Sequence, residues 1–150
     1  MDAMEQLYQQ IILDHSKARH GAGLLPDYDG ESFQVNTTCG DQVLLRVGLD
    51  GDRIAAIGYE GEGCSISQAS LSIMHDMTSG QSRETFDHLS DVFTEMMHSR
   101  GVFDETKLDE LDDASAFVGV AKFPARIKCA LLGWMALKEA IADADQGKEE

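Results

Sequence analysis

The sequence has no long apolar run and few basic residues. A membrane-spanning helix needs about 18 or more consecutive apolar residues, and the 150 residues contain no such run. Twelve Lys and Arg against 27 Asp and Glu give a formal net charge of −15. Because nucleic-acid binding rests on clustered basic side chains, this balance argues against a nucleic-acid partner. It favours solubility and a protein partner that carries a basic patch.

Several familiar signals are also missing. The first residues, Met1 to Glu5, are acidic and lack the basic-then-apolar layout of a signal peptide. We therefore expect a cytoplasmic protein with no membrane partner. No glycine-rich phosphate loop, Ser-His-Asp order or His-x-x-x-His pattern occurs. The familiar signatures of nucleotide binding and of triad hydrolysis are thus absent.

The composition is that of a globular domain. Hydrophobic residues make up 43% and charged residues 26% of the chain, which is ordinary for soluble proteins. At this length we expect residues 1–150 to form one domain with a sizeable core. Residues 146–150 are polar and are predicted to be a frayed tail.

Apolar residues recur at helical spacing in four segments. The pattern predicts helices over residues 2–20, 65–77, 82–97 and from 124 to beyond 141. Asp2 with Glu5, and Ser65 with Gln68, have the form of capping boxes, and Pro124 suits the first position of the last helix. The acidic, weakly periodic stretch 101–114 is interpreted as an irregular or partly helical surface segment.

Between the first two helices the pattern changes to that of strands. Residues 31–36, 43–49 and 53–60 alternate between apolar and polar, and Asp50-Gly51 is a hairpin signal. We therefore expect an α+β fold in which a small antiparallel three-stranded sheet packs against helices.

The turn Cys39-Gly40-Asp41 carries the clearest chemistry. Glycine allows a tight turn, which can aim the flanking thiol and carboxylate at one point, and both groups are zinc ligands. Cys64 and Cys129 stand near predicted helix starts, where the partial positive charge favours thiolates. Three thiols and one carboxylate make the four ligands of a tetrahedral zinc site.

Other interpretations of these residues stay open. The cysteine spacings are not those of a zinc finger, and a cysteine such as Cys129 is often simply a buried core residue. Three thiolates and Asp41 carry more negative charge than zinc offsets. Arg126, on roughly the same helical face as Cys129, can balance the excess, whereas Lys128 is expected in solvent. No histidine neighbours a cysteine, and His15 and His20 are expected near the end of the first helix, whose partial charge they would complement.

Three ordered segments resemble the SufU/IscU family of iron–sulfur cluster assembly proteins, and within it the SufU type; they are residues 36–41, 61–70 and 123–130. Lys128 stands where the IscU branch has a histidine, and no Leu-Pro-Pro-Val-Lys motif occurs. Residues 101–122 look like the insertion of the SufU type. Thr37 replaces the proline that is usual in the family, which is expected only to loosen the loop slightly.

The resemblance implies zinc held by Cys39, Asp41, Cys64 and Cys129. It also implies a zinc-dependent sulfurtransferase that accepts persulfide sulfur from a SufS-type cysteine desulfurase and serves downstream Suf assembly components. A desulfurase histidine would take a position on zinc and free Cys39 as the nucleophile. Arg126 matches a basic residue important for the site and for docking.

Two alternatives remain. The thiols also suit a [2Fe–2S] or [4Fe–4S] cluster, which would make the protein a scaffold on which a cluster is assembled and passed on. A structural zinc module that serves only as an interaction domain is the third. A structural site is typically closed, whereas ligands on the loop of Cys39 and Asp41 are expected to be exposed.

Overall fold

Three antiparallel strands form a meander in the order β1-β2-β3. The computed structural model describes residues 2–149 and places β1 at Gly30–Asn36, β2 at Asp41–Asp50 and β3 at Arg53–Glu62. Asn36 pairs with Asp41 and Asp50 pairs with Arg53, so both connections are short. Val43, Leu45 and Val47 alternate onto one fully buried face of β2. The predicted antiparallel sheet is confirmed.

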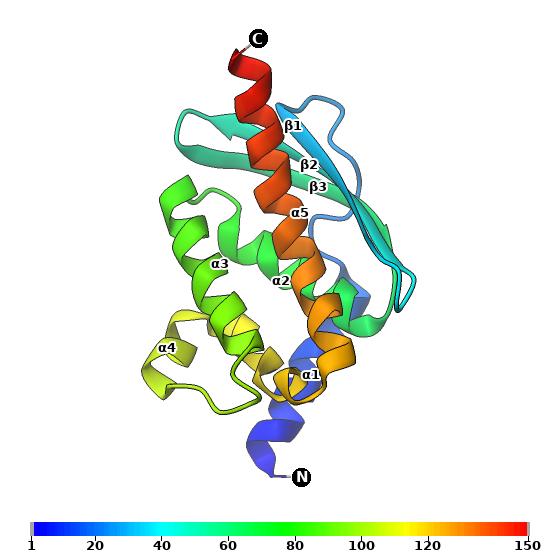
Figure 1. Cartoon of the computed structure of the whole chain (residues 1–150), viewed down its shortest axis with the longest axis vertical. Coiled ribbons are helices and arrows are strands. Elements are labelled where there is room, and N and C mark those ends of the chain that lie inside the picture. The colour runs from blue at the N-terminus through cyan, green and yellow to red at the C-terminus, as the bar shows by residue number, and fades with distance from the viewer. Residues whose placement is uncertain (1, 150) are drawn as a thin grey trace.

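Five α-helices and one 3₁₀ segment accompany this sheet within the described residues: α1 (Ala3–Ala18), α2 (Ser65–Thr78), α3 (Arg83–Met97), α4 (Glu105–Glu110), the 3₁₀ segment η1 (Asp112–Lys122) and α5 (Pro124–Glu149). The long α5 runs across the sheet and packs against β1 and β2 (Figure 1). α2 packs against both α1 and α5. The α+β class is therefore confirmed.

Aromatic stacking marks the core between α3 and α5. Trp134 of α5 stacks on Phe93 with ring centroids 4.7 Å apart, and it lies nearly parallel to Phe86 at 6.2 Å. All three side chains are buried. Such aromatic pairs contribute about 0.5–1.5 kcal/mol each beyond their burial. The core fixes α5, and with it the position of Cys129.

One predicted local feature, the capping box at the start of α2, is wrong. Ser65 does not cap α2: the N-cap is Cys64, and it makes no side-chain capping bond. The Gln68 amide is buried without a hydrogen-bond partner among the described residues, so it does not complete a capping box. By contrast, Asp2 caps α1 by accepting a hydrogen bond from the Glu5 backbone N–H at 2.8 Å.

The acidic stretch 101–114 is partly helical, as predicted, but it is not confined to the surface. Leu111 and Ala114 are fully buried, and η1 adds Phe117 to the core. Removing these apolar side chains from water stabilises the fold. The acidic residues around them hide the apolar periodicity in the sequence. At the other end, α5 includes residues 146–149, where a frayed tail was predicted; residue 150 lies outside the described residues. No helix among the described residues is long and apolar enough to cross a membrane.

Candidate metal centre

The turn between β1 and β2 carries Cys39 outward to the start of α5. Gly40 has a φ of +75°, a left-handed conformation that costs glycine nothing and other residues considerably more. Cys39 is exposed, and its Sγ lies 3.4 Å from Sγ of the buried Cys129 and 3.7 Å from the Ala125 carbonyl oxygen. The structure thus places these two candidate ligands side by side.

Asp41 was expected to be exposed on the loop, but it is fully buried, because it is the first residue of β2. Its Oδ1 accepts a hydrogen bond from the Cys64 backbone N–H at 2.9 Å, and its Oδ2 lies 3.9 Å from Cys64 Sγ. A buried carboxylate is costly unless it is hydrogen-bonded or paired with a cation. Asp41 therefore has the setting of a group that completes its interactions with a metal.

Gly63 makes the approach of Asp41 to Cys64 possible. A Cβ atom at position 63 would lie 2.3 Å from Asp41 Oδ1 and 2.5 Å from Ser67 Oγ, closer than real Cβ contacts come. A side chain at this position would push the carboxylate away. This steric role cannot be predicted from the local sequence, because Asp41 comes from β2, far from Gly63 along the chain.

Cys129 lies in the second turn of α5 and is almost completely buried. Burial raises the pKa of its thiol well above the ordinary range, and the neighbouring Asp41 and Cys39 raise it further. Without a cation the thiol therefore keeps its proton. Asn36 Nδ2 lies 3.6 Å from the Cys129 sulfur, where it can donate a hydrogen bond. This contact gives a role to a residue that sequence reasoning left without one.

The donor set fits a tetrahedral zinc ion. Cys39, Asp41 and Cys129 each place a ligand atom within 4.8 Å of the others, and Cys64 lies outside this group. Its sulfur is 3.9 Å from Asp41 Oδ2, so the fourth predicted ligand borders the cluster at Asp41. Zn–S bonds of 2.3 Å place two sulfurs about 3.8 Å apart in a tetrahedron, close to the observed 3.4 Å. A cation would also offset the charge of the buried carboxylate and hold the Cys129 sulfur as a thiolate.

Arg126 occupies a different position from the one expected. It is exposed on the first turn of α5, and its guanidinium carbon lies 5.6 Å from the centroid of the Phe123 ring. Among the described residues no ion pair or hydrogen bond joins its side chain to the four candidate ligands. Arg126 is thus near the site, one residue beyond Ala125, without neutralising it by contact. Lys128 is exposed, as predicted.

The amino-acid sequence is similar to those of known proteins along almost its whole length. The family described as NifU-like N terminal domain matches residues 7–130. The chain is 42% identical over 144 residues to the zinc-dependent sulfurtransferase SufU of Bacillus subtilis, covering 96% of this chain and 95% of that protein. It is 44% identical over 143 residues to the iron–sulfur cluster assembly scaffold protein IscU of Streptococcus pyogenes, covering 94% and 86% respectively.

Solved structures show the same arrangement. A putative iron–sulfur cluster assembly scaffold protein for the SUF system from Fervidobacterium islandicum superposes with a TM-score of 0.79 at 32% identity, covering 91% of this chain and 98% of that one. The N-terminal part of a NifU-like protein from Brucella abortus reaches a TM-score of 0.84 at 21% identity, over 97% and 99% of the two chains, and supports the fold alone. Together with the converging thiols, these likenesses show that the chain belongs to the SufU/IscU family of iron–sulfur cluster assembly proteins.

Proposed function

We propose that the protein is a zinc-dependent sulfurtransferase that accepts persulfide sulfur from a SufS-type cysteine desulfurase for iron–sulfur cluster assembly. The observation that carries this proposal is the unequal exposure of the ligands. Asp41 and Cys129 are buried, whereas Cys39 and Cys64 are exposed. Two ligands can therefore anchor the metal while Cys39 meets a partner. The similarity to Bacillus subtilis SufU supports this choice.

Cys39 is the proposed nucleophile. Zinc, when bound, would keep the thiol ionised and protected from oxidation. The Cys39 thiolate attacks the outer sulfur of the partner's persulfide and forms a new S–S bond. The bond inside the partner's persulfide breaks, and the partner's cysteine leaves as a thiolate. Cys39 then carries the transferred sulfur as a persulfide, and no outside oxidant or reductant is consumed.

Arg126 is proposed to assist the approach of the partner. Its exposed charge stands one residue from Ala125, whose carbonyl contacts the Cys39 sulfur. A fixed positive charge there attracts an anionic persulfide. Arg126 also lines a groove of about 740 Å³ that includes Phe123 and Ser65, the residue after Cys64. The groove offers space beside the thiols for a partner segment. In this proposal residues 1–150 act as one domain.

Alanine production by the desulfurase tests the proposal. The zinc-loaded protein is expected to stimulate the release of alanine from cysteine, and Cys39→Ala is expected to remove the stimulation. Thr37→Ala, in the same exposed turn but without a ligand atom, is the control and keeps it. Stimulation that survives in Cys39→Ala would contradict the assigned nucleophile.

Arg126 has its own matched comparison. Arg126→Ala is expected to raise the concentration of protein needed for half-maximal stimulation about tenfold, the equivalent of about 1.4 kcal/mol. Lys128→Ala removes a nearby exposed charge of the same helix, and it should leave stimulation unchanged. Equal losses in both variants would indicate general charge attraction and remove Arg126 from the site.

A cluster scaffold is the second candidate. The similarity to the scaffold protein of Streptococcus pyogenes favours it, and thiolates with a carboxylate are also suitable ligands for iron. A scaffold would bind iron and sulfide anaerobically at the cysteines and pass the cluster to an acceptor protein. Cluster transfer by a zinc-free protein, together with no stimulation of the desulfurase by the zinc form, would favour this function.

A further inference from the structure

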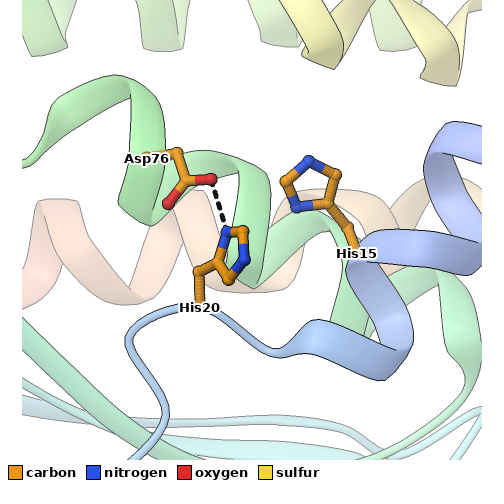
Figure 2. A group of neighbouring side chains, drawn as sticks. All are labelled: His15, His20 and Asp76. Atoms are coloured by element: carbon orange, nitrogen blue, oxygen red, sulfur yellow. Dashed lines mark hydrogen bonds and ion pairs between the residues drawn. The ribbon is translucent and has the colours of Figure 1, made fainter.

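We infer that His15, His20 and Asp76 form a second site, which binds a divalent first-row transition-metal ion through nitrogen and oxygen atoms. The three residues each offer one ligand atom, and these atoms lie within 4.8 Å of one another. Figure 2 shows His15 extending from α1, His20 from the loop that follows it, and Asp76 from α2. This site goes beyond the proposed sulfur transfer and does not depend on it.

The ligand atoms are close to the spacing that a metal needs. His20 Nδ1 lies 2.6 Å from Asp76 Oδ2, joined by a hydrogen bond. Metal–ligand bonds of about 2.0–2.1 Å in a tetrahedron place neighbouring donors about 3.3 Å apart, so this pair has to open by only a fraction of an ångström. The metal takes the place of the shared proton, and the imidazole keeps its N–H on Nε2, facing away.

Neighbouring groups already orient the ligands. His15 Nδ1 lies 2.8 Å from Ser72 Oγ, which also accepts a hydrogen bond from the His20 backbone N–H at 3.0 Å. His15 Nε2 lies 3.2 Å from Asp113 Oδ2. In the tautomer that donates this Nε2 proton to Asp113, the lone pair of His15 Nδ1 accepts a hydrogen bond from the Ser72 hydroxyl, and a metal at Nδ1 would replace that bond. A carboxylate behind a histidine ligand is the usual support of metal-binding imidazoles.

The electrostatic setting favours a cation. α1 ends at Ala18 and α2 ends at Thr78, so the cluster lies where two helix C-termini with partial negative charge meet. It borders a cavity of about 470 Å³ lined by the carboxylates of Asp76, Glu110, Asp112 and Asp113, with no Lys or Arg among the described lining residues. Such a one-signed cleft concentrates cations.

The donor set also separates this site from the cysteine centre. It has imidazole and carboxylate ligands and no thiolate, which suits Zn²⁺, Ni²⁺ or Cu²⁺ and is poor for a cluster. The side chains of His20 and Asp76 are 48% and 41% exposed, so an ion can enter from solvent. The His15 side chain is only 12% exposed and forms the inner side of the site. Cys64 and Asp76 are separated by about 18 Å of helix axis at 1.5 Å per residue.

Zinc is the appropriate probe, because added Zn²⁺ cannot replace the zinc at the cysteine centre by a different metal. Protein that already holds one zinc at the cysteine centre is titrated with further Zn²⁺ by calorimetry, and bound zinc is counted after gel filtration. We expect a second equivalent to bind. His20→Asn and Asp76→Asn are each expected to weaken the second equivalent at least tenfold and to leave the first unchanged. Both positions are exposed, so the fold should tolerate the changes.

Matched controls keep the result interpretable. His98→Asn removes an exposed histidine whose ring contacts the Thr94 carbonyl oxygen, and Asp91→Asn removes an exposed carboxylate of α3. Both controls should keep the second equivalent. The imidazole ¹⁵N resonances of His15 and His20 should also move on zinc addition. A protein that binds no second zinc, or variants and controls that bind it equally, would overturn the assignment.

Discussion

The two ends of α2 carry two chemically opposite groups. Cys64, the N-cap of the helix, contacts Asp41, whereas Asp76, in the last turn, lies beside His15 and His20. The N-terminal end has partial positive charge, which stabilises thiolates, and the C-terminal end has partial negative charge, which stabilises cations. One helix therefore presents soft anionic ligands at one end and nitrogen and oxygen donors at the other.

The ends also differ in how their groups are held. At the cysteine end, Asp41 and Cys129 are buried, and in the proposed zinc site the metal would balance their charge. At the histidine end the groups already satisfy one another by hydrogen bonds, with His20 and His75 each contacting one oxygen of Asp76. Metal removal should therefore damage the first end much more than the second.

The largest expected effect is that of Cys129→Ala. We expect loss of bound zinc and, at zinc concentrations about 100 times the dissociation constant, a loss of about 3 kcal/mol in the free energy of unfolding. Denaturant unfolding of zinc-loaded protein measures it. The control compares Cys129→Ala with the wild type in the presence of a chelator, where the loss of unfolding free energy should be much smaller. A variant that keeps zinc and stability would show that Cys129 is only a core residue.

Gly63→Ala should have the next largest effect. The added methyl group would overlap the Asp41 carboxylate, so zinc affinity should fall at least tenfold, or by about 1.4 kcal/mol. Competition with a chromophoric chelator measures the affinity. Gly119→Ala is the matched control, because no atom lies within 4 Å of its added Cβ. Unchanged affinity in Gly63→Ala would contradict the tight approach of Asp41.

Alkaline pH should weaken the metal-free protein through Cys129. The folded state holds the pKa of this thiol above the ordinary value of 9.0, so the unfolded chain releases the proton first. The resulting stability is present below about pH 9 and is lost above it, by up to about 1.4 kcal/mol per pH unit. Denaturant unfolding between pH 7 and about 9.5 measures this loss. Cys129→Ser cannot ionise there and should show a smaller decline; equal slopes would contradict the cause.

Acidic pH should lower the free energy of unfolding through Asp76, at the histidine end, by less than alkaline pH lowers it through Cys129. Burial acts to raise the pKa of Asp76, but hydrogen bonds from His20 and His75 outweigh it, and the pKa lies below 3.8. The stabilisation is thus present above that pH and is lost as the pH falls through the lowered value. Unfolding of wild type and Asp76→Asn should converge in strong acid. A constant difference between them down to pH 2 or so would remove ionisation as the cause.

The sequence indicated the elements that carry the cysteine end because its signals are local. Cys39-Gly40-Asp41 combines two ligands with the glycine that turns the chain, and Gly61 to Ser70 leads Cys64 into a helix. Alternation along β2 and helical spacing in α5 then placed the sheet and Cys129. These patterns are short-range, so they can be seen without the tertiary fold.

The histidine end was not predicted, because nothing local joins its members. His15 and His20 were assigned only to the end of α1, and Asp76 was given no role. Their meeting depends on the packing of α1 against α2 and on the bend after Ala18. The burial of Leu111 and Ala114 was missed for a related reason, since acidic neighbours masked the apolar face. The contact of the Arg126 guanidinium with the Phe123 ring likewise depends on the rotamer of Arg126, which the spacing of residues in the sequence does not determine.

The most direct test of the central claim locates the transferred sulfur. The zinc-loaded protein is incubated with a SufS-type desulfurase and cysteine, alkylated, digested and mapped by mass spectrometry. The account predicts one additional sulfur atom on the peptide that contains Cys39, and none on the peptides of Cys64 or Cys129. Sulfur found on Cys64 or Cys129 while Cys39 stays unmodified, or on no cysteine of a protein that holds zinc, would contradict it.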